Sequence, residues 1–319
     1  MMSQSHYFEP NANRPVVGRF APSPTGRMHA GNIYAALSAW LVAKSQGGTI
    51  VLRIEDLDRD RSKAEYISAV QRDFELLGLT WDHGPFFQHD RDEAYLEAFS
   101  ALERRGLVYP CFCTRADLHA ASAPHRGEKF VYPGTCRGLT AEQIAEKSMR
   151  RAPAQRLRVP DDTYSFEDMV QGRYKQNLAH DCGDFLIRRS DQAFAYQLAV
   201  VVDDAAQGVT SIVRGVDLLC STPQQLYLQE LLGLDHPRYA HIPLLVAEKN
   251  RRLSKRDHDA GIEELLARFK TPAAIIGHIA GICGLAPTCD PATPEQLLAT
   301  FDVARLPELF SDSVQIPWR

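Results

Sequence analysis

The chain has 319 residues, of which 45% are hydrophobic and 24% are charged, and its formal net charge at pH 7 is −4. This length and composition favour one large globular domain with appendages and argue against a low-complexity or disordered protein. No apolar run approaches the roughly 20 residues that cross a bilayer, so we expect no membrane-spanning segment. The net negative charge is unusual for a nucleic-acid-binding protein, although local basic segments could still contact RNA.

The first predicted unit is a strand, a tight turn and a helix. The β-branched run 16–21 favours a strand, and Ile33, Leu37 and Leu41 recur at helical spacing after the turn 22–32. Within this turn, Gly31 would let a phosphate approach the free N–H groups and the positive end of the helix. His29 would then face an anion. The alternative is an ordinary surface loop with an ordinary histidine.

A second strand is predicted over 49–54, and it runs directly into an acidic cluster that begins with Glu55. Ligands of open α/β sheets collect at the carboxyl ends of the strands, so Glu55 would lie where a substrate ammonium binds. For Asp56 and Asp58 we favour a role in capping the following helix.

Cysteines supply a separate signal. The chain has seven, without a signal-like start, which favours a reducing cytoplasm over a disulfide framework. Cys111, Cys113 and Cys136 cluster in the sequence, and three thiolates need a fourth donor to hold a tetrahedral zinc ion. His119 and His125 are the ordinary choices for that donor. Three reduced cysteines without a metal are the alternative.

The second half of the chain continues the alternation of strands and helices and contains a basic loop, Arg252 to Arg256. Alone, this loop would be a solvated basic segment or a contact to a nucleic-acid backbone. We predict strands over 184–188 and 241–246 and helices over 140–150, 261–269 and 272–283, with Pro287, Pro291 and Pro294 breaking the remainder.

The turn His29 to Asn32 and the loop Arg252 to Arg256 resemble the "HIGH" and "KMSKS" motifs of class I aminoacyl-tRNA synthetases. The lead over residues 18–26, Gly-Arg-Phe-Ala-Pro-Ser-Pro-Thr-Gly, is similar to the glutamyl and glutaminyl branch. One departure is Asn32, where the motif has a second histidine. Arg252 and Leu253 replace the lysine and methionine of the second motif, whereas the serine and lysine that follow them are intact.

The resemblance implies an α/β fold: a Rossmann-like parallel-sheet catalytic domain with an inserted zinc-binding subdomain and a short helical C-terminal region. The expected organisation is a flexible leader (1–15), the first half of the catalytic domain (16–110), the zinc-binding insertion (111–180), the second half with the lysine loop (181–256) and the helical C-terminal region (257–319).

The resemblance also implies roles for individual residues in an ATP-dependent ligase that activates L-glutamate as an adenylate. The expected catalytic residues are His29, Asn32 and Lys255, and the expected ATP-binding residues are His29, Gly31, Ser254 and Lys255, with Mg²⁺ accompanying ATP. The expected glutamate-binding residues are Arg19, Ser23, Glu55, Tyr196 and Arg214. For a structural zinc ion, the resemblance points to Tyr132 as the fourth ligand beside Cys111, Cys113 and Cys136.

The region after the lysine loop bears on the acceptor. Residues 257–319 are too few for the anticodon-binding body of a glutamyl- or glutaminyl-tRNA synthetase, so the chain resembles the truncated paralogues called glutamyl-queuosine tRNA(Asp) synthetases. This implies activation of glutamate without tRNA and transfer to queuosine in the anticodon of tRNA(Asp). The alternatives are a minimal glutamyl-tRNA synthetase that charges tRNA(Glu) and a non-catalytic RNA- or amino-acid-binding paralogue. We expect a cytoplasmic monomer.

Overall fold

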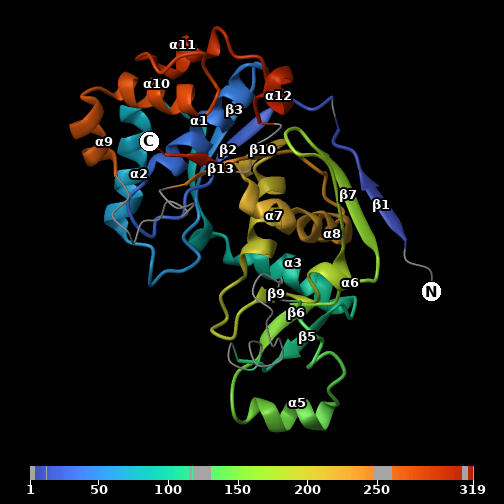
Figure 1. Cartoon of the computed structure of the whole chain (residues 1–319). Helices are drawn as coiled ribbons and strands as arrows, with labels where there is room; N and C mark the ends of the chain where they lie inside the picture. The colour runs from blue at the N-terminus through green and yellow to red at the C-terminus, as the bar shows by residue number, and fades with distance from the viewer. Residues whose placement is uncertain are drawn as a thin grey trace.

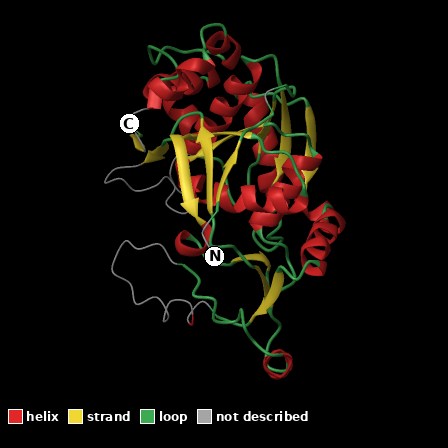
Figure 2. Cartoon of the chain, turned by 90° about the vertical axis from the view of Figure 1, so that its right-hand side faces the viewer, coloured by secondary structure: helices red, strands yellow, loops and turns green. Residues whose placement is uncertain are grey.

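The computed structural model describes residues 4–11, 13–114, 117, 131–246, 261–310 and 315–318. A larger α/β body carries a smaller lobe at one end, and α5 forms the tip of this lobe, far from the C-terminal helices (Figures 1 and 2). Within the described ranges, no helix combines the length and the apolar composition that a bilayer crossing requires.

The body is built on parallel strands from both halves of the chain. β2 (Val17–Phe20), β3 (Thr49–Ile54) and β4 (His83–Phe87) pair in parallel, as do β10 (Ser211–Gly215) and β11 (Arg238–Ile242). β2 and β10 lie side by side, because the Thr210 N–H donates to the Val17 carbonyl at 2.9 Å. The expected Rossmann-like α/β fold is confirmed.

Helices cover both faces of these strands, and β3 and β10 are almost entirely buried. α1 (Ala30–Lys44) and α2 (Ala64–Leu76) share one buried cluster with Val213 of β10. The second buried cluster contains Ile212, the residue before Val213 in β10. It is formed with α3 (Asp92–Arg104), α7 (Tyr196–Ala206) and α8 (Thr222–Leu232). The strand and helix predicted around the first turn are confirmed, as is the strand over 49–54.

The start of the chain corrects the expected flexible leader, because residues 5–8 form a strand. β1 (Ser5–Phe8) pairs in parallel with β7 (Thr163–Asp168), beside which it lies in Figure 1. The physical reason is an alternation of aromatic side chains: the rings of His6 and Phe8 stack on Tyr164, with centroid distances of 4.7 and 5.4 Å.

The smaller lobe contains an antiparallel sheet of β5 (Val108–Cys111), β6 (Ala154–Leu157) and β9 (Phe185–Arg188), with α5 (Ala141–Ser148) beyond it. Strand pairing therefore differs from the expected division of the chain. β7 and β8 (Gly172–Asn177), expected within the insertion, belong to the sheet that contains β11. β9, expected in the second catalytic half, pairs with β6. Short helical segments η1 (Gln88–Asp90), α6 (Leu178–Asp181) and η2 (Val216–Ser221) complete these connections.

The C-terminal region packs against α1 and against the strand that leads to the basic loop. It contains α9 (Ile262–Phe269), α10 (Pro272–Ile282), α11 (Pro294–Leu298), η4 (Val303–Arg305), α12 (Leu306–Phe310) and β13 (Gln315–Pro317), which pairs with β12 (Leu244–Val246). The two predicted helices are confirmed. Two predictions need correction. The predicted strand 241–246 is divided at Pro243 into β11 and β12. Pro294, expected to break the remainder, instead begins a helix, where its missing N–H is tolerated.

Candidate active site

A cavity of ≈ 430 Å³ lies between the carboxyl ends of β2, β3, β10 and β11 and the start of α1. Its wall brings together every predicted catalytic, glutamate-binding or ATP-binding residue that the structure describes: Arg19, Ser23, His29, Gly31, Asn32, Glu55, Tyr196 and Arg214. Ser254 and Lys255 lie outside the described residues, as do His119 and His125. The roles of these side chains stay predictions, but the structure shows that the described ones line one cavity.

The first motif shapes the start of α1. The Nδ1 atom of His29 accepts a hydrogen bond from the Gly31 N–H at 3.1 Å, and the side-chain oxygen of Asn32 accepts one from the His29 N–H at 3.1 Å. These two bonds form a capping box. Asn32 therefore has a structural use for its amide oxygen. Because Nδ1 accepts, the neutral His29 ring carries its proton on Nε2.

Gly31 lies close to the ring of His29. A Cβ atom at position 31 would lie 3.0 Å from Cε1 and 3.1 Å from Nδ1 of that ring, so a side chain there would need the ring to shift by a few tenths of an ångström. Glycine therefore has a packing reason at this position as well as a chemical one.

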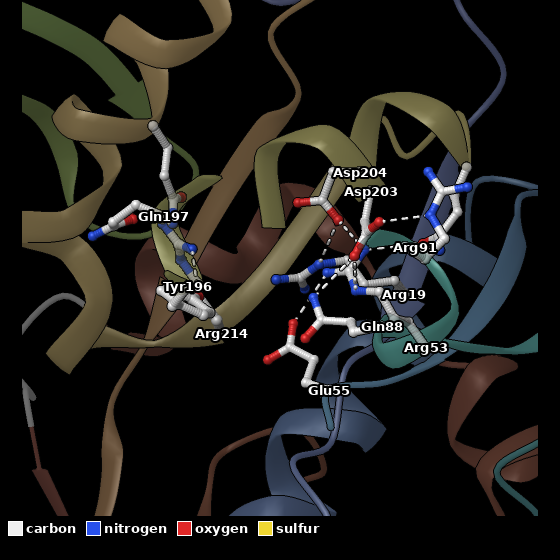
Figure 3. Close-up of polar contacts among 12 residues, drawn as sticks. Arg19, Arg53, Glu55, Gln88, Arg91, Tyr196, Gln197, Asp203, Asp204 and Arg214 are labelled. Carbon is white, nitrogen blue, oxygen red and sulfur yellow. Dashed lines mark hydrogen bonds and ion pairs between the residues drawn. The ribbon is translucent and has the colours of Figure 1, made fainter. Parts of the chain in front are cut away.

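Arg53 is the centre of a buried ionic network beside the cavity (Figure 3). Its side chain is fully buried and donates to Asp204 at 2.7 Å and to Glu55 at 3.2 Å, while Asp203 lies 4.0 Å from its Nε. Burial alone would lower the pKa of Arg53, but the three carboxylates outweigh it and raise the pKa. This arginine is therefore a permanent cation that ties β3 to α7.

Arg19 continues this network to the wall of the cavity. Its Nε lies 3.6 Å from the Asp204 carboxylate, and its Nη1 donates to the Val213 carbonyl at 3.2 Å. Burial lowers the pKa of Arg19, and the neighbouring guanidiniums of Arg53 and Arg214 act in the same direction. Asp204 is the carboxylate that compensates this charge.

Glu55 is the acidic end of the same chain of charges. Its side chain is only 11% exposed and lies against Arg53. Burial raises the pKa of Glu55, and the arginine opposes this shift. The cavity thus has a carboxylate on one part of its wall and guanidiniums on another.

Arg214 is bound by neutral groups. Its Nε donates to His241 Nε2 at 3.0 Å, its Nη2 donates to the Thr222 hydroxyl at 2.8 Å, and its Nη1 lies 3.5 Å from the Tyr196 hydroxyl. Its Cζ lies 5.3 Å from the centre of the Tyr239 ring. Within the described part of the chain, none of these partners is a carboxylate. The charge of this buried arginine is directed at a cavity without a direct counter-ion.

Sequence reasoning missed several residues in and beside this wall: Arg53, Asp203, Asp204, His241, and Asp168, whose carboxylate lies 2.6 Å from His241 Nδ1. A signal existed for three of them. Arg53 interrupts an apolar strand, and Asp203 and Asp204 follow three valines in an apolar helix, which is costly unless the charges pair. The capping role of Asp56 was wrong, because α2 starts after Lys63 and Asp56 instead accepts a hydrogen bond from the His89 N–H at 3.0 Å. Asp58 accepts a hydrogen bond from the Arg61 N–H, in the turn that precedes α2.

The three cysteines meet in the smaller lobe. The sulfur atoms of Cys111, Cys113 and Cys136 lie within 4.8 Å of one another, and the last two are 3.6 Å apart. In a tetrahedral site with Zn–S bonds of about 2.3 Å, sulfurs are about 3.8 Å apart. The Tyr132 hydroxyl lies 3.5 Å from the first sulfur and 3.8 Å from the second. This donor set fits a metal ion.

Arg156 adds positive charge to this cluster. Its Nε donates to the Cys111 sulfur at 3.2 Å, and its guanidinium lies 3.6 Å above the Tyr132 ring. Burial would raise the pKa of Cys111, but hydrogen bonds from Tyr132 and Arg156 outweigh it and lower the pKa. A thiolate is the form that binds a metal.

Comparison with known proteins identifies the family. The profile described as tRNA synthetases class I (E and Q), catalytic domain, matches residues 15–285. The "Glutamyl-Q tRNA(Asp) synthetase" of Nitratidesulfovibrio vulgaris is 44% identical over 92% of this chain and 94% of that protein. That of Symbiobacterium thermophilum is 42% identical over 95% of this chain and 96% of that protein. The chain belongs to the glutamyl-Q tRNA(Asp) synthetase family. It is a ligase of the aminoacyl-tRNA synthetase type.

Solved structures agree with this fold. The synthetase is similar to a glutamate tRNA ligase from Elizabethkingia meningosepticum, crystallised in complex with its amino acid, with a TM-score of 0.79 and 25% identity over 95% of this chain and 67% of that one. The glutamate-tRNA synthetase of Elizabethkingia anophelis gives a TM-score of 0.80 at 24% identity, over 96% of this chain and 68% of that one.

Replacing Arg53 by methionine should destabilise the synthetase strongly. The variant leaves Glu55, Asp203 and Asp204 buried without their shared cation, which costs about 3–5 kcal/mol of unfolding free energy at pH 7.5. Burial without a counter-charge raises the pKa of these carboxylates, so the folded variant binds protons more readily. The loss of unfolding free energy relative to the wild type should therefore be smaller at pH 5 than at pH 7.5. Urea unfolding at both values measures this.

Arg91→Met is the matched control. The Nε of Arg91 also contacts Asp203, at 3.0 Å, but its side chain is 30% exposed. We expect a loss of about 1 kcal/mol with little pH dependence. Equal losses for the two variants would contradict the central place of Arg53 in the network.

Proposed function

We propose that this enzyme activates L-glutamate with ATP, without needing tRNA, and transfers the glutamyl group to the queuosine base in the anticodon of tRNA(Asp). The observation that carries the first step is Arg214, a buried guanidinium in the cavity wall whose described partners are neutral. Such a group binds a carboxylate strongly, because the anion supplies the missing counter-charge.

Glutamate matches the distribution of charge in the cavity. Its side-chain carboxylate would bind Arg214 and Arg19, with the Tyr196 hydroxyl as a further donor, since burial raises the pKa of that phenol and keeps it protonated. Its ammonium group would face Glu55, and Ser23 would contribute a hydroxyl nearby. Glutamine lacks the negative charge that the arginines require, so the cavity favours the acid over the amide.

ATP would bind across the start of α1. Gly31 supplies close access to backbone N–H groups at the positive helix end, and His29 carries a proton on Nε2 that can be donated to a phosphate oxygen. An oxygen of the substrate α-carboxylate attacks the α-phosphorus, the bond to the β-phosphate oxygen breaks, and pyrophosphate leaves. Ser254 and Lys255 would stabilise the charge on the leaving group, with Mg²⁺ bound to the nucleotide. Asn32 holds His29 in place.

Two comparisons support queuosine in tRNA(Asp) as the acceptor. The relatives named glutamyl-Q tRNA(Asp) synthetase match at 42–44% identity over 94–96% of their own length. The glutamate-tRNA ligase structures match at 24–25% identity over 67–68% of theirs. The monomeric state and the cytoplasmic location stay predictions.

Two linked assays test the proposal. Exchange of labelled pyrophosphate into ATP should depend on glutamate and proceed without tRNA. Transfer of labelled glutamate should then occur to tRNA(Asp) that carries queuosine, and not to unmodified tRNA(Asp) or to tRNA(Glu). Absence of exchange with every amino acid would refute the activation step, while charging of tRNA(Glu) alone would refute the acceptor.

We also propose that Cys111, Cys113, Cys136 and Tyr132 hold one structural zinc ion. Bound there, zinc would cross-link β5 to residues 132–136, and four protein ligands would leave no position for a reacting water. Arg156 would offset the negative charge of three thiolates and a phenolate.

Metal analysis of the purified protein should give one zinc per chain, and Cys136→Ser should lose it. Tyr132→Phe should retain zinc but release it to a chelator at least about tenfold faster, because one of four ligands is missing. His119→Ala and His125→Ala are the controls and should release it at the normal rate. Fast release from either histidine variant, with normal release from Tyr132→Phe, would assign the fourth ligand to that histidine.

A further inference from the structure

His241, one of the neutral partners of Arg214, is itself held by a buried carboxylate. His241 on β11 accepts from Arg214 through Nε2 at 3.0 Å, and its Nδ1 lies 2.6 Å from an oxygen of Asp168, at the end of β7. The residues Arg214, His241 and Asp168 are 5%, 0% and 3% exposed, respectively. Three strands of one sheet thus supply a chain of hydrogen bonds that ends at the cavity.

The donors in this series of hydrogen bonds fix the tautomer of His241. A guanidinium N–H can only donate, so Nε2 of the ring must accept and the proton of the neutral ring lies on Nδ1. Asp168 accepts that proton through Oδ2. Its other oxygen, Oδ1, accepts from the backbone N–H groups of Val170, Gln171 and His241 at 3.0, 2.9 and 3.1 Å. The carboxylate therefore has a fixed orientation.

We propose that Asp168 and His241 are positioning residues for Arg214: they orient its guanidinium by a neutral acceptor and leave its charge available for the carboxylate of the substrate. This inference rests on the proposed activation of glutamate. Burial lowers the pKa of His241, with the charge of Arg214 acting in the same direction, so the ring stays a neutral acceptor near pH 7.

The two arginines of the cavity wall support this division. Arg19 lies 3.6 Å from Asp204, so part of its charge is compensated within the protein. At Arg214 the imidazole of His241 separates the guanidinium from the Asp168 carboxylate. A carboxylate in direct contact with Arg214 would have to be displaced or opposed by the substrate anion, whereas a neutral acceptor orients the arginine without that competition.

Asp168→Asn tests the tautomer argument. The three backbone N–H groups hold the amide oxygen where Oδ1 now lies, so the amide NH₂ faces His241 Nδ1. The ring must then accept at Nδ1 and carry its proton on Nε2, opposite a guanidinium that can only donate. The bond to Arg214 is lost. We expect the KM for glutamate in pyrophosphate exchange to rise about tenfold, with kcat within about threefold of the wild type.

His241→Gln is the conservative variant. With Asp168 intact, the glutamine NH₂ can donate to the Asp168 carboxylate while the glutamine oxygen accepts from Arg214, so the direction of the hydrogen bonds is kept. We expect its KM for glutamate to rise less than that of Asp168→Asn. Asp184→Asn is the matched control, because Asp184 is also a buried carboxylate that accepts backbone and phenol hydrogen bonds, from Val159 at 2.8 Å and Tyr109 at 2.7 Å. Its KM for glutamate should be unchanged.

The outcomes separate this inference from the proposed function. Wild-type enzyme without glutamate-dependent exchange would refute the function itself. With an active wild type, an unchanged KM in Asp168→Asn would refute the positioning role. A KM for glutamate in His241→Gln as high as in Asp168→Asn would refute it as well. So would an equal rise in KM for Asp184→Asn, provided that each variant keeps the melting temperature of the wild type.

Discussion

Positive charge is buried beside the ligand cavity, and the side chains around it are arranged to stabilise that charge. Arg19 and Arg53 lie on neighbouring strands of one sheet and Arg214 lies on β10, beside them. Each of these buried arginines needs a partner that replaces water. The protein meets this need in two ways. Arg53 lies among three carboxylates, and its contacts with those of Asp203 and Asp204 hold β3 against α7. Arg214 has only neutral partners among the described residues. The first arrangement supports the fold, and the second favours an anionic ligand.

These two arrangements explain the polarity of the cavity. The alternating series Glu55, Arg53, Asp204 and Arg19 begins with a carboxylate and ends with a guanidinium, both in the cavity wall. An amino acid with an acidic side chain presents the complementary charges. Activation of its α-carboxylate then needs only a nucleotide at the adjacent start of α1, because adenylation depends on positioning and charge stabilisation and not on a covalent enzyme intermediate.

Several features of the fold and the site could be predicted from short stretches of sequence. The turn before α1, the strand over 49–54 and the clustering of three cysteines are short-range patterns, and the structure places Arg19, His29, Glu55, Tyr196 and Arg214 in one wall as expected from the family motifs. The supporting contacts depend on residues far apart in the chain: Arg53 meets Asp204 across 151 positions and Asp168 meets His241 across 73. The pairing of β1 with β7 likewise needs a partner more than 150 residues away. Local patterns carry no information on such pairings.

We infer that Arg214, which has no direct counter-ion among the described residues, selects a substrate with an anionic side chain. Calorimetric titration of the enzyme with glutamate and with glutamine, without ATP, measures this selection directly. We expect wild-type enzyme to bind glutamate at least about 100-fold more tightly than glutamine, and Arg214→Met to lose this preference because only its binding of glutamate weakens. Equal affinities in the wild type, or a preference that survives in Arg214→Met, would contradict it.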